Sequence, residues 1–215
     1  TMGCGIENTK HTIRQVLLQE TNILNACVHL PYGFSLIPAD HNLTGLQVKL
    51  MQFNRQEQML KEAIKPIKDN YDFIFIDCPP TLSTLTLNSL VAADSVLIPI
   101  QCEYYSLEGL ASMNKTINEI NDATGEKIEI SGILRTMYDS RIRLSREVSQ
   151  ELEEHFSEQL CDTVIPRNVK LAEAPSFGMP ALYYEPEAKG TLAYLALAGE
   201  IINKYETNSA SLIND

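Results

Sequence analysis

The 215-residue sequence lacks the features that mark several specialised classes of protein. No stretch approaches the roughly 20 apolar residues that a bilayer-spanning helix needs, so the sequence predicts no membrane span. The five cysteines are an odd number without CxxC spacing. This argues against a disulfide framework or a zinc site and indicates the reduced thiols of a cytoplasmic protein. The formal net charge of −11 argues against nucleic-acid binding over the whole surface and leaves only a local basic face open.

What the sequence does contain is an alternation of strand-like and helix-like segments. Short apolar runs bounded by proline or glycine predict strands, and apolar residues at helical spacing predict helices. Strands are expected over residues 33–38, 73–76, 95–100, 128–134 and 162–166, and helices over 9–19, 43–51, 56–68, 85–93, 105–121, 144–160 and 191–205. This alternation predicts an α/β fold with a doubly wound, mostly parallel sheet and helices on both faces. We expect one domain over residues 1–205, followed by a polar tail over residues 206–215.

The stretch from Tyr71 to Pro80 is the centre of this pattern. The four apolar residues 73–76 favour a strand buried on both faces, and Pro79 and Pro80 would end it because proline cannot donate to a sheet ladder. Asp77 is therefore expected at the carboxyl end of a buried strand, where open α/β sheets bind ligands. A carboxylate in this place is typical of a Mg²⁺ site. The alternative is an ordinary aspartate in the turn that ends the strand.

Two later segments also leave the carboxyl ends of predicted strands. Thr136 and Met137 follow one strand, and this methionine can supply an apolar wall for a nucleobase while its polar neighbours supply hydrogen bonds. Asn168 follows the strand that ends at Pro166, where its amide can reach the same base. The alternative for Met137 is an ordinary core residue.

A set of cations accompanies these segments and comprises Arg141, Arg143, Arg146, Arg167 and Lys170. Phosphate binding by lysine and arginine does not depend on base sequence and requires only a clustered cationic face. The set therefore indicates a DNA-binding surface. Its alternative is a solvated surface with scattered charge.

Four segments together resemble the ParA/Soj family of chromosome- and plasmid-partitioning ATPases. They are residues 77–80, 98–105, 136–141 and 165–176, and they occur in the family's order. The resemblance extends from Thr1 to about Tyr205. It implies a deviant Walker-type ATPase with the P-loop NTPase fold, which dimerises with ATP and Mg²⁺ between its subunits. Such dimers bind DNA non-specifically in the cytoplasm, on the nucleoid, and a ParB-type centromere-binding partner releases them by stimulating hydrolysis.

The resemblance also implies roles for individual residues. Asp77 is the catalytic carboxylate on the Mg²⁺ side of the site. The residues expected to line the adenine are Thr136, Met137, Pro166 and Asn168. Arg167 and Lys170 are expected to contact DNA, together with the neighbouring arginines at positions 141, 143 and 146.

The sequence departs from the family in a way that bears on activity. The family's phosphate-binding loop, Lys-Gly-Gly-Val-Gly-Lys-Thr, has no counterpart in these 215 residues, and Thr1-Met2-Gly3 resembles the residues that directly follow it. We therefore expect a domain without the family's first strand and P-loop, which is the remainder of a longer protein. We expect that this domain alone does not hydrolyse ATP. Whether the chain is an enzyme stays open, and ATP and Mg²⁺ are cofactors of the intact family member.

Further departures concern DNA binding and lead to two alternatives. Arg135 stands where the family usually has an apolar residue, and the segment 186–190 has fewer cations than usual. With the acidic net charge, this predicts weak, salt-sensitive DNA association. The alternatives are a non-catalytic truncated paralogue that acts as an interaction protein, and a MinD-like regulator that positions the division site. The polar tail lacks the charge and apolar stripe of a membrane-binding helix, so we expect no membrane partner.

Overall fold

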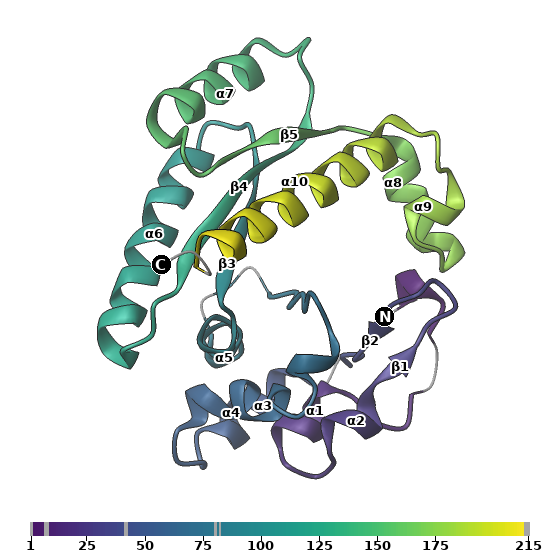
Figure 1. Ribbon diagram of the computed structural model, residues 1–215, viewed down its shortest axis with the longest axis vertical. Coiled ribbons are helices and arrows are strands. Elements are labelled where there is room, and N and C mark those ends of the chain that lie inside the picture. The colour runs from purple at the N-terminus through teal and green to yellow at the C-terminus, as the bar shows by residue number, and fades with distance from the viewer. Residues whose placement is uncertain (1, 7–8, 41–42, 80, 82, 213–215) are drawn as a thin grey trace. The chain divides into compact units, whose positions relative to one another are not determined.

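The computed structural model describes residues 2–6, 9–40, 43–79, 81 and 83–212, which form two compact units (Figure 1). The first unit contains residues 6–95 and 118–129, and the second contains residues 2–5, 96–117 and 130–215. Thr1, Pro80 and the last three residues of the expected tail lie outside the described residues. Within the described part of the chain, no helix combines the length and the apolar character that crossing a bilayer requires.

The first unit is mainly helical. Its elements are α1 (Ile13–Leu17), α2 (Ile23–Ala26), β1 (Val28–His29), β2 (Ser35–Leu36), α3 (Leu43–Leu50), η2 (Gln56–Gln58), α4 (Met59–Ile64), η3 (Lys68–Asn70) and α5 (Thr84–Ala92). The strands β1 and β2 pair antiparallel. Side-chain caps lie at the amino ends of α2 and α5. The Asn22 side chain accepts a hydrogen bond from the Leu24 backbone N–H at 2.9 Å, and the Ser83 side chain accepts one from the Thr86 backbone N–H at 3.4 Å.

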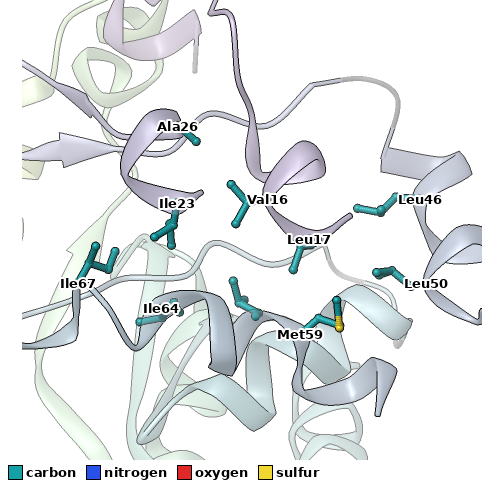
Figure 2. Packing of buried hydrophobic residues seen from close by; sticks show 10 residues of the cluster. Val16, Leu17, Ile23, Ala26, Leu46, Leu50, Met59, Ile64 and Ile67 are labelled. Carbon is teal, nitrogen blue, oxygen red and sulfur yellow. The ribbon is translucent and has the colours of Figure 1, made fainter. Parts of the chain in front are cut away.

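A cluster of aliphatic side chains from separate helices forms the core of the first unit (Figure 2). It comprises Val16, Leu17, Ile23, Ala26, Leu46, Leu50, Met59, Leu60, Ile64 and Ile67. Asn88 on α5 is a polar residue inside this unit and is 0% exposed. Its Nδ2 donates to the carbonyl oxygens of Gln56 and Thr84 at 2.7 and 2.9 Å, and its Oδ1 accepts from the Leu60 N–H at 3.1 Å. Asn88 therefore ties η2 and α4 to α5.

The second unit contains a three-stranded sheet in the order β3 (Ser95–Gln101), β4 (Glu129–Tyr138) and β5 (Leu160–Pro166). The strands β4 and β5 pair in parallel. Two side chains of β4 reach β3: Ser131 donates to the Val96 carbonyl and Thr136 to the Ile100 carbonyl, both at 3.2 Å. These contacts advance in the same direction along both strands, so β3 also runs parallel to β4. The predicted α/β fold class is confirmed.

Helices cover both faces of this sheet (Figure 1). Successive residues of a strand point to opposite faces. Ile133 packs with residues of α6 (Ser106–Thr124) and α7 (Arg143–Phe156), whereas its neighbour Leu134 packs with Leu197 of α10 (Lys189–Leu212). The remaining elements of the unit are η1 (Met2–Cys4), α8 (Val169–Glu173), η4 (Ala174–Phe177) and α9 (Ala181–Tyr184).

Most predicted segments recur in the structure with shifted ends. The helix predicted to end at Leu160 ends at Phe156, and Leu160 instead begins β5. The last helix continues to Leu212, beyond its predicted end at Tyr205. The helix predicted over residues 56–68 is divided into η2 and α4.

The prediction of a buried strand over residues 73–76 is wrong. Residues 72–79 belong to no strand of the described chain, and Phe73, Ile74 and Phe75 are 39, 39 and 75% exposed. Ile76 is half-buried against the core of the first unit. An apolar run favours a strand, but ladder hydrogen bonds from a neighbouring strand are needed to form one. Asp77 is therefore exposed in an irregular segment and does not end a buried strand.

Candidate functional site

The carboxyl ends of β4 and β5 lie side by side in the second unit. Tyr138 is in register with Pro166, and the backbone N–H of Arg167 donates to the Tyr138 carbonyl at 3.1 Å. The structure thus brings the segment at Thr136 and Met137 to the same sheet edge as Pro166 and the residues that follow it. All four residues predicted to line the adenine lie in these two adjacent segments.

Met137 has an unusual backbone conformation at this edge. Its φ angle is 51°, in the left-handed region that few residues other than glycine, asparagine and aspartate adopt, and its side chain is 43% exposed. The next residue, Tyr138, still pairs with β5. Backbone strain of this kind is concentrated at binding and active sites. Residue type alone gave no signal of this conformation, because methionine does not favour it.

Asn168 has a structural role that the sequence reasoning missed. Its Oδ1 accepts from the Lys170 N–H at 2.9 Å and so caps the amino end of α8. The amide nitrogen is the part of the side chain left to face a ligand. An asparagine directly before a helix-forming segment is the signal that predicts this cap.

Asp77, the predicted Mg²⁺ ligand, belongs to the first unit and is exposed. Among the described residues, the structure gathers no three histidine, cysteine, aspartate or glutamate side chains that could hold a metal ion. Mg²⁺ is commonly bound by one or two carboxylates together with water and substrate phosphates. A single accessible carboxylate fits that kind of site, in which phosphate oxygens supply other ligands, and does not fit a site built wholly from protein.

Three of the five predicted DNA-binding cations form ion pairs within the second unit. Arg141 pairs with Asp139 through its Nε at 2.9 Å and its Nη2 at 2.6 Å. The other two pairs are Arg143 with Glu147 at 2.7 Å and Lys170 with Glu173 at 2.9 Å. Glu173 also accepts from the Tyr184 hydroxyl at 3.1 Å.

The remaining two cations are arranged differently. Arg146 donates to the Ser140 carbonyl at 2.7 Å, and Arg167 is exposed next to the end of β5. Neither one pairs with a carboxylate of the described residues within 4.0 Å. Side-chain and backbone hydrogen bonds from Arg141 lower the pKa of Asp139 to about 2, and the charge of Arg167 acts in the same direction. Asp139 is therefore fully ionised near neutral pH.

Arg135, the cation that departs from the expected apolar pattern, lies inside the second unit. Its side chain is 8% exposed. It donates to Ser149 at 2.9 Å, to Glu153, and to the Cys161 carbonyl at 3.1 Å. Arg135 thus joins β4 to α7 and β5 and is not part of the surface that would meet DNA.

A parallel sheet with helices on both faces defines an open α/β protein, the class in which ligands bind outside the carboxyl ends of the strands. The AAA domain family profile matches residues 1–130. The chain is 40% identical over 213 residues to the chromosome partitioning protein ParA of Caulobacter vibrioides, covering 97% of this chain and 79% of that protein. It is 39% identical over 204 residues to the sporulation initiation inhibitor protein Soj of Bacillus subtilis, covering 94% and 81%. The chain belongs to the ParA/Soj family of chromosome-partitioning ATPases.

A solved structure shares this fold. Cobyrinic acid a,c-diamide synthase from Mycobacterium smegmatis superposes with a TM-score of 0.80 at 28% identity, covering 95% of this chain and 78% of that chain. Its form with bound ADP and magnesium has a TM-score of 0.71 at 30% identity, covering 81% and 73%. The fold therefore occurs in a protein whose structure was determined with a magnesium nucleotide.

Proposed function

We propose that this chain acts in DNA partitioning as a nucleotide- and DNA-binding protein of the ParA/Soj type. Family membership supports the biological role, and the names of the relatives favour partitioning over positioning of the division site. The observation that carries the proposal is the pairing of Tyr138 with Pro166, which brings the two candidate base-binding segments to one sheet edge.

The adenine site is proposed at that edge. The exposed Met137 side chain supplies an apolar wall, and Pro166 supplies a second one. The amide nitrogen of Asn168 can donate to a ring nitrogen of the base while its oxygen continues to cap α8. The Thr136 hydroxyl donates to the Ile100 carbonyl, so it offers its oxygen as an acceptor.

Members of this family hydrolyse ATP with Mg²⁺, and Asp77 is the residue whose carboxylate is proposed to hold the metal. The 215 residues contain no glycine-rich loop followed by lysine and serine or threonine, the element that cradles β- and γ-phosphates. The residues named above are proposed to recognise the base and DNA.

The DNA site is proposed on the surface formed by Arg141, Arg143, Arg146, Arg167 and Lys170, which we call the basic surface. Contacts of these cations with phosphates do not depend on base sequence and weaken with salt. A second copy of the chain and a ParB-type protein are the proposed partners, by analogy with the family.

Equilibrium binding of a fluorescent ATP analogue tests the base site through the substitution Asn168→Asp. Aspartate is as good a helix cap as asparagine, so α8 is retained, but the amide donor is lost. We expect binding to weaken about three- to tenfold, the contribution of one net hydrogen bond. Unchanged binding by Asn168→Asp would remove Asn168 from the site.

The matched control is Asn22→Asp. Asn22 caps α2 in the first unit through the same kind of bond, so this variant makes the same chemical and charge change outside the proposed site. It should bind the analogue as the unsubstituted chain does. If the unsubstituted chain binds DNA but no nucleotide, the result would instead support the alternative function, a non-catalytic interaction protein.

A further inference from the structure

Gly190 stands in the first turn of α10, at a position where the backbone does not require glycine. Its φ angle lies outside the left-handed region, and glycine in a helix is generally less favourable than alanine. Gly199, further along the same helix, is exposed, and a Cβ atom there would meet open space. Gly190 differs because it is buried against α8 (Figure 1). The reason for glycine at this position therefore lies in its surroundings.

The space beside Gly190 is too small for a side chain. A Cβ atom at this position would lie 2.6 Å from Cδ1 and 2.7 Å from Cγ of Leu171, and 3.0 Å from Cβ of Asn168. Carbon atoms that are not bonded attract each other best at about 3.5–4.0 Å, so the shorter distances mean repulsion. The absence of a side chain therefore lets α10 approach both α8 and Asn168, the residue that caps α8.

Of these two helices, α10 is held more firmly. Its Leu197 packs with Leu134 in the core beside the sheet. Near its amino end, Thr191 is 2% exposed and donates its hydroxyl to the Glu185 carbonyl at 2.8 Å. The helix α8 has only five residues, and none of them is fully buried. A new side chain on the first turn of α10 would therefore displace α8 together with its capping residue.

We propose that Gly190 is a positioning residue of the base site, which acts by holding the Asn168 amide at the distance from α10 that the base requires. This inference rests on the proposed function, in which the amide nitrogen of Asn168 donates to the base while its oxygen caps α8. The cap ties Asn168 to α8, and the close approach at Gly190 sets where both lie relative to α10. A displaced donor makes a longer and weaker hydrogen bond with the base.

The decisive variant is Gly190→Ala, and its matched control is Gly199→Ala. Both replace a glycine of α10 by a better helix former, but only the first brings a Cβ against Asn168 and Leu171. Equilibrium binding of the fluorescent ATP analogue should weaken about three- to tenfold in Gly190→Ala, as expected for Asn168→Asp, and should not change in Gly199→Ala.

The outcomes distinguish this inference from the proposed function. If Asn168→Asp weakens binding and Gly190→Ala does not, the inference is overturned and the base site stands. If neither variant weakens binding, the proposed base site itself is wrong, and the inference is overturned with it.

A double variant separates positioning from a general loss of stability. If Gly190 acts through Asn168, Gly190→Ala should not weaken binding further once Asn168→Asp has removed the donor. A structural effect on the whole unit would instead add to the effect of Asn168→Asp. Additive losses would therefore refute the inference.

The side-chain amide signals of Asn168 report the displacement without any nucleotide. Their loss from a nitrogen–hydrogen correlation spectrum of Asn168→Asp identifies them in nuclear magnetic resonance. They should shift in Gly190→Ala and keep their positions in Gly199→Ala. Signals that stay in place in both variants would contradict the proposed contact.

Leu171→Ala keeps the inference testable if Gly190→Ala alone does not fold. It removes the two atoms closest to the new Cβ, so that the closest remaining contact is that with the Asn168 Cβ at 3.0 Å. The chain with both Gly190→Ala and Leu171→Ala should bind the ATP analogue more weakly than Leu171→Ala alone. Equal binding by these two variants would overturn positioning through Asn168.

Discussion

Replacing Glu153 by alanine should destabilise the protein more than replacing Arg135 by methionine, although Glu153 is the more exposed of the two. The Glu153 side chain is 57% exposed and that of Arg135 only 8%. Removing Glu153 leaves a buried guanidinium with hydrogen bonds to Ser149 and Cys161 but without its counter-charge. Removing Arg135 leaves a carboxylate that water can solvate.

The magnitudes follow from this difference. Breaking a buried ion pair so that a charge stays buried costs about 3–5 kcal/mol, and the lower end applies here because Arg135 keeps two other partners. We therefore expect about 3 kcal/mol for Glu153→Ala, or a fall in Tm of about 6–12 °C. Methionine fills much of the space of the arginine stem, and replacing buried ionic groups by apolar ones is often nearly neutral. We expect Arg135→Met to lie within about 1 kcal/mol of the unsubstituted chain.

Urea unfolding followed by circular dichroism measures these differences as shifts of the midpoint. The double variant, Arg135→Met with Glu153→Ala, should be about as stable as Arg135→Met alone, because Glu153 then has no buried charge to neutralise. The reasoning would be refuted if Glu153→Ala were nearly neutral while Arg135→Met cost several kcal/mol. Additive effects in the double variant would refute it as well.

Two further predictions concern polar side chains that hydrogen-bond to the backbone, one in each unit. Asn88→Ala should destabilise the first unit by about 3 kcal/mol in the same assay, because it leaves the Leu60 N–H and the Gln56 carbonyl without their side-chain partner. The control is Asn118→Ala, which changes an exposed asparagine and should be neutral. Burial raises the pKa of Glu200, but hydrogen bonds from the Thr163 and Asp162 backbone outweigh it, so the pKa is lowered overall. The stabilisation by Glu200 is present above the ordinary carboxyl pKa and is lost as the pH falls through the lowered pKa. Glu200→Gln should therefore be less stable than the unsubstituted chain at about pH 6, with the difference shrinking toward about pH 3; a constant difference would contradict this cause.

Local sequence patterns anticipated much of the second unit. The apolar spacing of α7 predicted its inward residues, since Val148 and Leu152 are buried as expected and Phe156 packs beside them. The apolar runs of β3, β4 and β5 predicted strands at the correct places. These predictions succeeded because each element supplies its own periodicity, and the strands find their neighbours within the unit.

The same kind of pattern failed over residues 73–76. Their apolar character is evident in the sequence, but a strand is completed only by the hydrogen bonds of a neighbouring strand. The partners of individual side chains could not be predicted from the sequence either, because they depend on distances across the folded chain. The sequence marked Arg135 as unexpected and could not show that it lies buried against Ser149 and Glu153.

The sequence by itself determined the family, the fold class and the identity of the candidate site residues, because these follow from ordered motifs and local periodicity. Only the tertiary structure decided which of these residues lie close together. It placed Met137 and Asn168 at one sheet edge, through the register of β4 with β5. It also paired Arg141, Arg143 and Lys170 with carboxylates, because an ion pair depends on the distance between two charges in the folded chain and not on their presence in the sequence.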